Sequence, residues 1–463
     1  MGDPPTRSPA VNTLLILGGH GDLATRYLLP AAAELIDAGL FPARLRIVAV
    51  DRAEIDTADY RDHVVDELRQ HAPHLPERTR AELCSRLDYR PGSATEAGDL
   101  RAAVAGLDGA IAVYLALPNA VFHDTIASLG EVGLPPGSRL VVEKPFGVDQ
   151  ADAQQLNALI RQEFSEDHVF RIDHVLGEQI VLDVLGLRFG NRLFESAWTA
   201  EHIESVDIVF DETIALEGRA GYYDHAGALR DMIQNHLLQM LAVVAMEPPT
   251  ELNERELRDR KADVLRAVRP PEPARMREAS RRARYSAGRS PDGSAVPAYV
   301  DEPDVDADRA TETYAEVTFS IHNVRWAGVP FRLRTGKALG ADRREIVVRF
   351  RPPNHQPFDN RGAVEQLRFT MGPDSIRFDV NLNGAGDPAE LQSQAFVADV
   401  GEQRLPSYSR LLREVVAGDT TLSVRGDEAE ECWRIVEPVL AAWTAGEVPL
   451  EEYPAGSDGP GAR

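Results

Sequence analysis

Thr13-Leu-Leu-Ile-Leu-Gly18, continued by Gly19-His20-Gly21-Asp22-Leu23, is the stretch that decides the fold. An apolar run that ends in glycine is typical of a buried parallel strand. A helical pattern over residues 23–38 and a second apolar run over residues 45–50 follow, which completes one βαβ unit. Glycines at such a turn let backbone N–H groups approach a pyrophosphate at the positive end of a helix. We expect the turn to bind a dinucleotide, with a plain glycine-rich turn as the alternative.

The same alternation of apolar runs and helical patterns continues along the first third of the chain. It is seen as a helical stretch around 58–87, a strand at 110–117, a helix at 121–133 and a strand at 140–143. This order predicts a doubly wound α/β domain of the Rossmann type, which we place at residues 11–172.

The remainder, residues 173–463, has a different pattern of hydrophobic and polar residues. Helical patterns occupy residues 174–187 and 224–246, and period-two segments occur at 206–210, 315–321, 346–351 and 376–382. Alternation suits a sheet with one covered face, so we expect an α+β domain with a large, mainly antiparallel sheet. Residues 268–310 are predicted to be a long excursion, and the basic stretch Arg275–Arg289 to be a solvated helix face or connection.

Composition and charge exclude several classes of protein. Of the 463 residues, 43% are hydrophobic and 27% are charged, as in a globular protein. The formal net charge is −24 without a long basic run, so we expect no nucleic-acid or membrane partner. The N-terminus lacks a signal-peptide core, and no stretch approaches the ~20 apolar residues of a membrane span, so the cytoplasm is expected. Cys84 and Cys432 suggest neither a disulfide framework nor a metal site.

Only three of the 50 basic residues are lysines: Lys144, Lys261 and Lys337. Since arginine carries nearly every generic positive charge, each lysine is a candidate for a role that needs an ammonium group. Lys144 directly follows a predicted strand and would stand at its carboxyl end, where doubly wound sheets bind ligands. An exposed loop lysine is the alternative.

Asp51 and Arg52 follow the second predicted strand. A carboxylate at this position usually bonds the ribose diol of NAD, whereas an arginine accommodates the 2′-phosphate of NADP. Because the chain has both side chains, its sequence leaves NAD and NADP open. Two surface turn residues are a further alternative.

Asp173-His174 and the later Asn235-His236 are candidates for proton transfer. Oxidation of an alcohol needs a base that takes the hydroxyl proton as the hydride leaves carbon, and imidazole suits this role near neutral pH. A carboxylate on the other ring nitrogen would fix the tautomer. A buried structural histidine is the alternative, because spacing alone does not prove a pairing.

Taken together, these segments resemble the glucose-6-phosphate dehydrogenase family over nearly the whole chain. The motifs that carry the resemblance are Gly-Asp-Leu-Ala (21–24), Tyr-Leu-Ala-Leu-Pro (114–118), Glu-Lys-Pro-Phe-Gly (143–147), Arg-Ile-Asp-His (171–174), Asp-Met-Ile-Gln-Asn-His-Leu-Leu-Gln (231–239), Arg-Thr-Gly-Lys (334–337) and Tyr-Pro-Ala-Gly-Ser (453–457). The resemblance implies NAD(P)-dependent oxidation of the C1 hydroxyl of a pyranose sugar to the lactone. It also implies a homodimer or homotetramer.

The family pattern assigns roles to individual positions. His236 would be the general base and Asp173 its carboxylate partner, while Lys144 would lie between cofactor and sugar. The sugar site would be lined by His174, Glu178, Glu212, Asp231 and Lys337. The implied cofactor-binding residues are Gly18, Gly19, His20, Gly21, Asp22, Leu23, Asp51, Arg52, Ala116, Pro118, Phe122 and Lys144. Family precedent favours NADP, whereas Asp51 favours NAD.

The chain departs from the family where the family holds the substrate phosphate. Val175 and Glu178 replace a tyrosine and a lysine that help to bind this phosphate. Exchanging an ammonium for a carboxylate removes an attraction and adds a repulsion, which should cost several kcal/mol in a partly desolvated site. Rescue of the phosphate by neighbouring arginines is the alternative. Two milder changes are His20 for serine or threonine, and Phe122 for an aromatic that is often tyrosine.

We therefore expect a C1 dehydrogenase whose sugar is neutral, or carries an amine that Glu178 contacts. True glucose-6-phosphate dehydrogenase activity is the alternative. A hypothesis from another functional class is a catalytically silent homologue that binds sugar or cofactor and regulates a partner enzyme. Such a homologue should have lost the site residues, but Asp173, His236, Lys144 and Lys337 are all retained.

Overall fold

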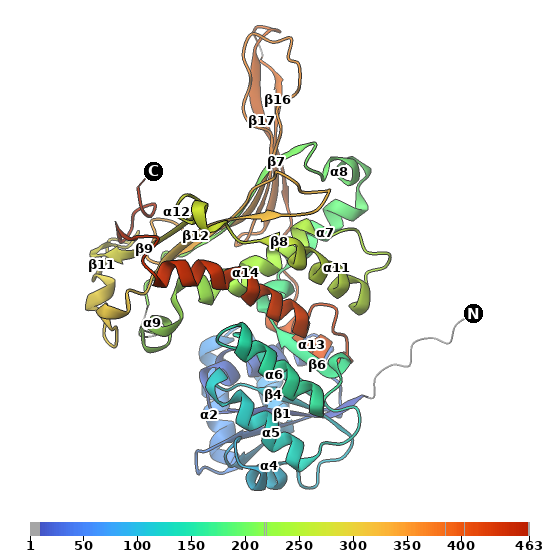
Figure 1. Cartoon of the computed structure of the whole chain (residues 1–463). Coiled ribbons are helices and arrows are strands. Elements are labelled where there is room, and N and C mark those ends of the chain that lie inside the picture. Colours follow the sequence, from blue (N-terminus) through green and yellow to red (C-terminus); the bar gives the residue numbers. More distant parts are fainter. Residues whose placement is uncertain (1–9, 217, 219, 385, 402, 462–463) are drawn as a thin grey trace. The chain divides into compact units, whose positions relative to one another are not determined.

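The computed structural model describes residues 10–461, with the exception of 217, 219, 385 and 402. The chain forms two compact units (Figure 1). The first unit comprises Met1–Glu178, Pro249–Asp259 and Gln403–Glu430. The second unit comprises Gln179–Pro248, Arg260–Glu402 and Glu431–Arg463.

A six-stranded parallel sheet in the order β3-β2-β1-β4-β5-β6 organises the first unit. Its strands are β1 (Val11–Leu17), β2 (Arg46–Asp51), β3 (Leu87–Pro91), β4 (Ala110–Leu115), β5 (Arg139–Glu143) and β6 (Val169–Ile172). The strand order reverses between β1 and β4, and at such a reversal the connections diverge and leave a crevice at the carboxyl ends. The predicted Rossmann-type fold is thereby confirmed.

The helices of this unit form two groups, and the helices within each group contact one another. One group contains α1 (Leu29–Asp37), α2 (Thr57–His71) and α3 (Glu77–Arg86), and the other contains α4 (Ala97–Val104), α5 (Phe122–Val132) and α6 (Gln150–Glu163). Right-handed crossovers place such groups on opposite faces of a parallel sheet. The single helical stretch predicted around 58–87 was wrong, because Pro73 and Pro76 cannot continue a helix and separate α2 from α3.

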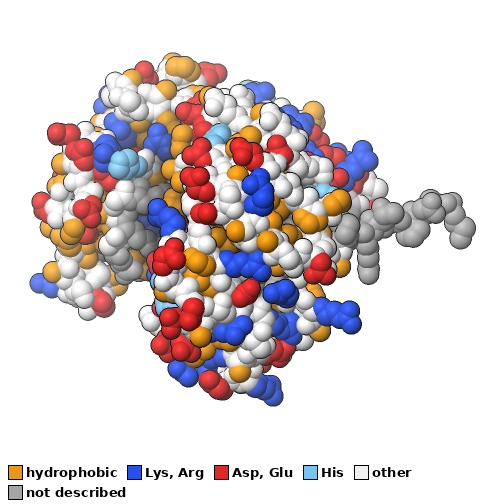
Figure 2. Space-filling view, turned by 90° about the horizontal axis from the view of Figure 1, so that it is seen from below, with side chains coloured by type: hydrophobic (Ala, Val, Ile, Leu, Met, Phe, Trp, Pro, Cys, Tyr) orange, Lys and Arg blue, Asp and Glu red, His pale blue; other side chains and the backbone are white. Residues whose placement is uncertain are grey.

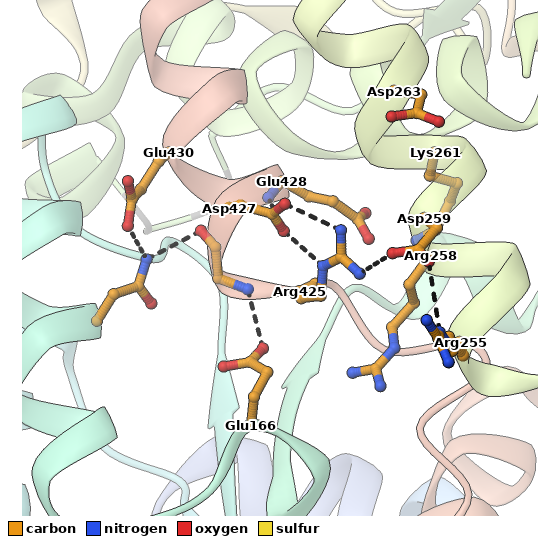
Figure 3. A network of polar contacts seen from close by, with 12 residues as sticks. Glu166, Arg255, Arg258, Asp259, Lys261, Asp263, Arg425, Asp427, Glu428 and Glu430 are labelled. Atoms are coloured by element: carbon orange, nitrogen blue, oxygen red, sulfur yellow. Dashed lines mark hydrogen bonds and ion pairs between the residues drawn. The ribbon is translucent and has the colours of Figure 1, made fainter.

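Two later segments of the chain complete the first unit through a polar network (Figure 3). The guanidinium of Arg425 donates to Asp427 at 2.7 and 2.9 Å and also to Asp259. The adjacent Gly426 N–H donates to Glu166 at 3.0 Å, and Asn157 donates to the Gly426 carbonyl at 2.9 Å. The helix α13 (Ser407–Ala417) belongs to the same part of the chain.

A ten-stranded mixed sheet dominates the second unit. The order along its main path is β17-β16-β15-β14-β7-β13-β12-β9-β18, and β8 pairs with β12. The strands are β7 (Ile203–Asp211), β8 (Val268–Arg269), β9 (Ser280–Ser286), β12 (Tyr314–Ile321), β13 (Phe331–Gly336), β14 (Arg343–Phe350), β15 (Gln366–Thr370), β16 (Ser375–Asn383), β17 (Leu391–Asp399) and β18 (Leu450–Pro454). Two of its pairs are parallel, β7 with β13 and β9 with β18, so the expected mainly antiparallel sheet is confirmed.

The two faces of this sheet differ. One face is apolar, with side chains such as Ile208, Ile346 and Phe369 fully buried, and α7 (Gln179–Gly190) and the wide-turned helix η5 (Leu229–Leu237) contact the strands. The other face carries ion pairs, for example the buried Asp207 carboxylate between the guanidinium groups of Arg332 and Arg349. Packing on one face thus decides the register, because a shift by one residue would bury the charges.

The segment 268–310 is not a plain excursion. It supplies β9, which lies between β12 and β18. The basic stretch Arg275–Arg289 was therefore interpreted wrongly, since Ser280, Ala283 and Tyr285 of β9 are buried and Arg281 pairs with Glu451 at 2.6 Å. Partly buried arginines on both faces of this strand interrupt its period-two pattern.

The strands β16 and β17 form a long hairpin that projects from the sheet (Figure 1). On the face shown in Figure 2, acidic, basic and hydrophobic side chains are interspersed, and basic groups do not gather into one continuous patch. Among the residues that the structure describes, no helix combines the length and apolar character needed to cross a bilayer.

Candidate active site

The glycine turn after β1 has a backbone that requires glycine. Gly18 has φ +89°, and a Cβ added there would lie 2.2 Å from the Ala116 carbonyl oxygen. A Cβ on Gly19 would lie 2.6 Å from the Cβ of Ala49. The N–H groups of Gly18 and Gly19 both donate to the Val50 carbonyl, at 2.9 and 3.0 Å. The turn is therefore locked against β2 and β4 with room only for backbone.

A cavity of about 290 Å³ opens at this turn, at the carboxyl ends of β1, β2 and β4. The predicted cofactor residues that line it are Gly18, Gly21, Asp51, Arg52, Ala116 and Pro118. The loop Gly92–Thr95 also lines it, and sequence reasoning missed this loop. The pair Gly92-Ser93, which directly follows the alternating run 87–91, could have predicted a loop at a strand end. A glycine cradle, a helix start and a strand-end crevice fit a dinucleotide.

The predicted cofactor residues of this unit differ in their surroundings. Asp51 accepts hydrogen bonds from the backbone N–H groups of His20, at 3.1 Å, and Arg52, at 2.7 Å. Asp22 is exposed and lies 3.7 Å from Arg26. Phe122 is 1% exposed in α5, which makes it part of the apolar core of this unit. Leu23 is partly buried at the start of the wide-turned segment η1 (Ala24–Leu28).

Lys144 and Asp173 follow β5 and β6, which are adjacent parallel strands with Glu143 in register with Ile172. Their side chains therefore leave neighbouring strand ends at the edge where α/β sheets bind ligands. Glu143 is buried and accepts a hydrogen bond from the Tyr114 hydroxyl. Burial raises the pKa of Glu143 to about 7, with the bond from Tyr114 opposing the rise and the nearby Asp173 adding to it.

Asp173 begins the segment that carries the altered motif. Its carboxylate is fully buried and accepts the Val175 N–H at 3.2 Å, which caps the short helix η4 (His174–Gly177). The ring of His174 stacks on Tyr408, with centroids 5.9 Å apart. Glu178 accepts a hydrogen bond from the Ser407 hydroxyl at 2.6 Å. No pattern in the sequence indicated that α13 would supply these partners.

The second unit presents its candidate residues on η5 and on two strand ends. The π-helical turns of η5 carry Asp231, Asn235 and His236, and His236 is 2% exposed. The Asn235 side chain accepts the His236 N–H at 2.7 Å and donates to the Arg230 carbonyl at 2.9 Å. π-helical turns are rare and frequently occur at functional sites.

Glu212 and Lys337 form an ion pair of 2.8 Å in the second unit. They follow β7 and β13, which run parallel with Asp211 in register with Gly336, so both side chains start at the same edge of the sheet. The Lys337 ammonium also lies 5.4 Å from the centre of the Tyr223 ring, a cation–π distance. The structure thus brings these two predicted residues together. Asp173 and His236 belong to different units, and their pairing stays a prediction.

The fold and these residues define a nicotinamide-dependent sugar dehydrogenase, and comparison with known proteins agrees. A family model described as "Glucose-6-phosphate dehydrogenase, NAD binding domain" matches residues 15–183, and one described as "Glucose-6-phosphate dehydrogenase, C-terminal domain" matches residues 185–463. The chain belongs to the glucose-6-phosphate dehydrogenase family.

Individual relatives agree with this family. Glucose-6-phosphate 1-dehydrogenase of Zymomonas mobilis is 38% identical, over 97% of this chain and 96% of that protein. The Gluconobacter oxydans enzyme of the same name is 40% identical, over 96% and 94%. A solved glucose-6-phosphate dehydrogenase in complex with glucose 6-phosphate is 32% identical with a TM-score of 0.89, over 99% of this chain and 97% of that one. The Mycobacterium avium structure has a TM-score of 0.86 at 32% identity, over 98% and 96%.

Proposed function

We propose that the chain oxidises the C1 hydroxyl of glucose 6-phosphate to the lactone and passes the hydride to NADP or NAD. The observation that carries this proposal is the likeness, over nearly full length, to relatives that bear the name glucose-6-phosphate 1-dehydrogenase. Retention of the glycine turn, Lys144, Asp173, His236 and Lys337 supports active chemistry over a silent regulatory role. This substrate differs from the neutral or amino sugar expected from the sequence.

In this proposal His236 takes the C1 hydroxyl proton, and Asp173 holds the imidazole in the required tautomer and stabilises its charged form. The nicotinamide ring supplies the hydride acceptor. The glycine turn leaves room for the pyrophosphate at the start of the helix that follows it, and Lys144 lies between cofactor and sugar. The sugar hydroxyls and phosphate are held by His174, Glu212, Asp231 and Lys337. We also propose a boundary between a dinucleotide-binding domain, residues 11–172, and a substrate-binding and oligomerisation domain, residues 173–463.

A second candidate substrate, a neutral or amino sugar, is favoured by one observation. The carboxylate of Glu178 stands where the family has a lysine for the phosphate, and Ser407 holds it at 2.6 Å. A fixed negative charge repels a phosphate and would attract an ammonium group. Glucose and glucosamine are therefore the competing substrates to test.

Reduction of NADP and NAD measured with glucose 6-phosphate, glucose and glucosamine decides between these candidates. A kcat/KM at least about 100-fold higher for glucose 6-phosphate, or about 2.7 kcal/mol, supports the first. A preference for glucose or glucosamine supports the second, and absence of turnover with all three contradicts both.

The variant Glu178→Lys tests the charge argument. It should lower the KM for glucose 6-phosphate by about tenfold and change kcat little, because the phosphate is remote from C1 and binds ground and transition states alike. Glu163→Lys, an equal charge change at an exposed position on α6, is the matched control. An unchanged KM in Glu178→Lys would mean that the carboxylate does not face the phosphate.

The proposal includes a homo-oligomer. The strand β17 is one of the two edge strands of the large sheet, the other being β18, and eight of its nine residues are exposed. Phe396 and Val397 on this strand are 63% and 61% exposed, and β17 contains neither lysine, arginine nor proline, the residues that usually protect an edge. A second copy of the chain would cover this edge by pairing β17 with β17.

A further inference from the structure

The third lysine of the chain, Lys261, has no part in the proposed chemistry, although the use of arginine elsewhere makes each lysine a candidate for a specific role. It lies on α11 (Glu254–Ala267; Figure 3) and is only 1% exposed. Its ammonium donates to the side-chain oxygen of Gln239 at 3.1 Å. Lysine is rarely buried to this extent, because its charge must be taken out of water. A buried polar contact of this kind can specify one arrangement of the elements that it joins.

Gln239 is the second residue of α10 (Leu238–Ala245), which continues directly from η5, the helix that carries His236. Gln239 is 1% exposed, and its side-chain N–H also donates to the sulfur of Cys432 on α14 (Gly426–Thr444) at 3.8 Å. One glutamine thus connects α10 with two other helices of the second unit. The connection lies three residues after His236.

The bond from Lys261 lies where the wide turns of η5 end. The Leu238 N–H donates to the carbonyl of Ile233, five residues back, which is the spacing of a π-helix. The α-helix α10 begins at the same residue. The wide turns therefore give way to the α-helix between His236 and Gln239, the residue that Lys261 holds.

The opposite end of η5 is held by a second buried side chain. The Glu312 carboxylate, which is 6% exposed, accepts the Leu229 N–H at 3.0 Å, and the Glu312 carbonyl accepts the Ala228 N–H at 3.1 Å. The preceding Gly227 has φ +71°, and a Cβ there would lie 2.5 Å from the same carboxylate. Because both ends are fixed, the residues between them have to be accommodated by the wide turns.

A shift of the wide turns by one residue would redirect the imidazole. Successive residues of a helix are turned by about 100° around its axis, so the His236 side chain would point to a different side of η5. Asn235 bonds backbone groups of η5 itself, at Arg230 and His236, and these groups would move with the helix. Lys261 reaches Gln239 from another helix and can therefore fix η5 relative to the rest of the unit.

We propose that Lys261 is a positioning residue for the base of the reaction: by holding Gln239, it fixes the residue at which the wide turns end and thereby the direction of the His236 imidazole. The inference rests on the proposed role of His236. It requires no contact of Lys261 with sugar or cofactor, so the effect of Lys261 should appear in kcat rather than in substrate binding.

The variant Lys261→Met removes the ammonium and keeps most of the length of the side chain. With NADP⁺ and the preferred sugar of the substrate test, kcat should fall at least about tenfold, since a misplacement of about 1 Å at a catalytic group can cost about 100-fold. The KM values should change less than about threefold. Arg188→Met is the matched control, because Arg188 is also buried and donates to the carbonyls of Val243 and Met246 at the far end of α10. It should lower the temperature of thermal unfolding and leave kcat unchanged.

A cycle with His236→Asn separates positioning from a general loss of structure. If Lys261 acts through the imidazole, adding Lys261→Met to His236→Asn should lower kcat by less than about a further twofold, because the group that Lys261 orients is already absent. The inference is overturned if Lys261→Met lowers kcat by the same factor in both backgrounds, or leaves kcat unchanged in the otherwise wild-type enzyme. A wild-type kcat in His236→Asn would contradict the proposed role of His236, and this inference with it.

Variants of Gln239 test the same bond if Lys261→Met does not fold. Gln239→Leu removes the acceptor, whereas Gln239→Glu keeps an oxygen for the ammonium. Gln239→Leu should reproduce the fall in kcat, and Gln239→Glu should retain at least about half of the wild-type kcat. Circular dichroism and thermal unfolding establish that each variant is folded. Equal kcat values in the two folded variants would overturn the inference.

Discussion

Glu143 illustrates how a single enclosed carboxyl group can set a pH dependence. It ends β5, it is 7% exposed, and burial raises its pKa to about 7. A folded-state pKa above the unfolded value of about 4.5 means that the folded protein binds the proton more tightly. The contribution of Glu143 to stability is therefore largest below pH 4.5 and is lost as the pH rises to about 7.

The variant Glu143→Gln should remove this loss. Its amide oxygen can still accept the Tyr114 hydroxyl, but the group no longer ionises. Between pH 5 and pH 8 the free energy of unfolding of the wild type should fall relative to that of the variant, by on the order of 3 kcal/mol. Urea denaturation at the two pH values measures this difference, and parallel pH profiles of the two proteins would contradict it.

His236 is the residue on which the proposed chemistry depends most. The variant His236→Asn should lower kcat by ~10²–10⁴, because no base remains to take the hydroxyl proton. Calorimetric cofactor binding should be unchanged, which also shows that the variant is folded. His202→Asn, an exposed histidine of the second unit, is the control. A kcat near the wild-type value in His236→Asn would remove His236 from its role.

At the scale of elements, β1, β2, β4 and β5 of the first unit were predicted, because both faces of a parallel sheet are buried and leave continuous apolar runs. The two edge strands β3 and β6 were not predicted, since charged residues interrupt their short apolar patterns. The strand β9 was also not predicted, because it contains arginines on both faces, and Arg281 and Arg284 pair with Glu451 and Glu452 of β18. The π-helical turns of η1 and η5 were also unpredictable. One extra residue in a turn is stabilised by packing against distant segments, so the local sequence pattern does not encode it.

The same limit applies to the polar network of Figure 3, which connects segments far apart in the sequence. Arg425 binds Asp427 and Asp259, and these bonds raise its pKa, so the guanidinium stays charged. The variant Arg425→Leu leaves two carboxylates with one partner fewer and should lower the free energy of unfolding by about 1–3 kcal/mol. Thermal unfolding measures this effect. Arg192→Leu, whose side chain is 88% exposed, should change it by less than about 0.5 kcal/mol.

At the scale of the whole molecule, the chain distributes its candidate residues over two units. The resemblance predicted roles for many of these residues but did not include the loop Gly92–Thr95, whereas the cavity beside Gly18 could be placed at a strand end by topology alone. The partners of these residues could not be identified. Ser407 beside Glu178 and Tyr223 beside Lys337 come from elements whose position depends on packing of the complete fold.

The proposed pairing of two copies of the chain through β17 can be tested by mutation. A two-fold axis at Ala395 would pair two β17 strands in antiparallel register and set Asp399 opposite Leu391, so that no like charges meet. The double variant Phe396→Asp, Val397→Lys places charges on the proposed interface and should shift the protein toward monomer, with a dimer dissociation constant raised at least about tenfold. Light scattering after size-exclusion chromatography over a range of concentrations measures this. Val324→Asp is the matched control, because Val324 is 99% exposed on a loop outside the sheet. If the double variant keeps the mass of the wild type at every concentration, the edge of β17 does not hold the oligomer together.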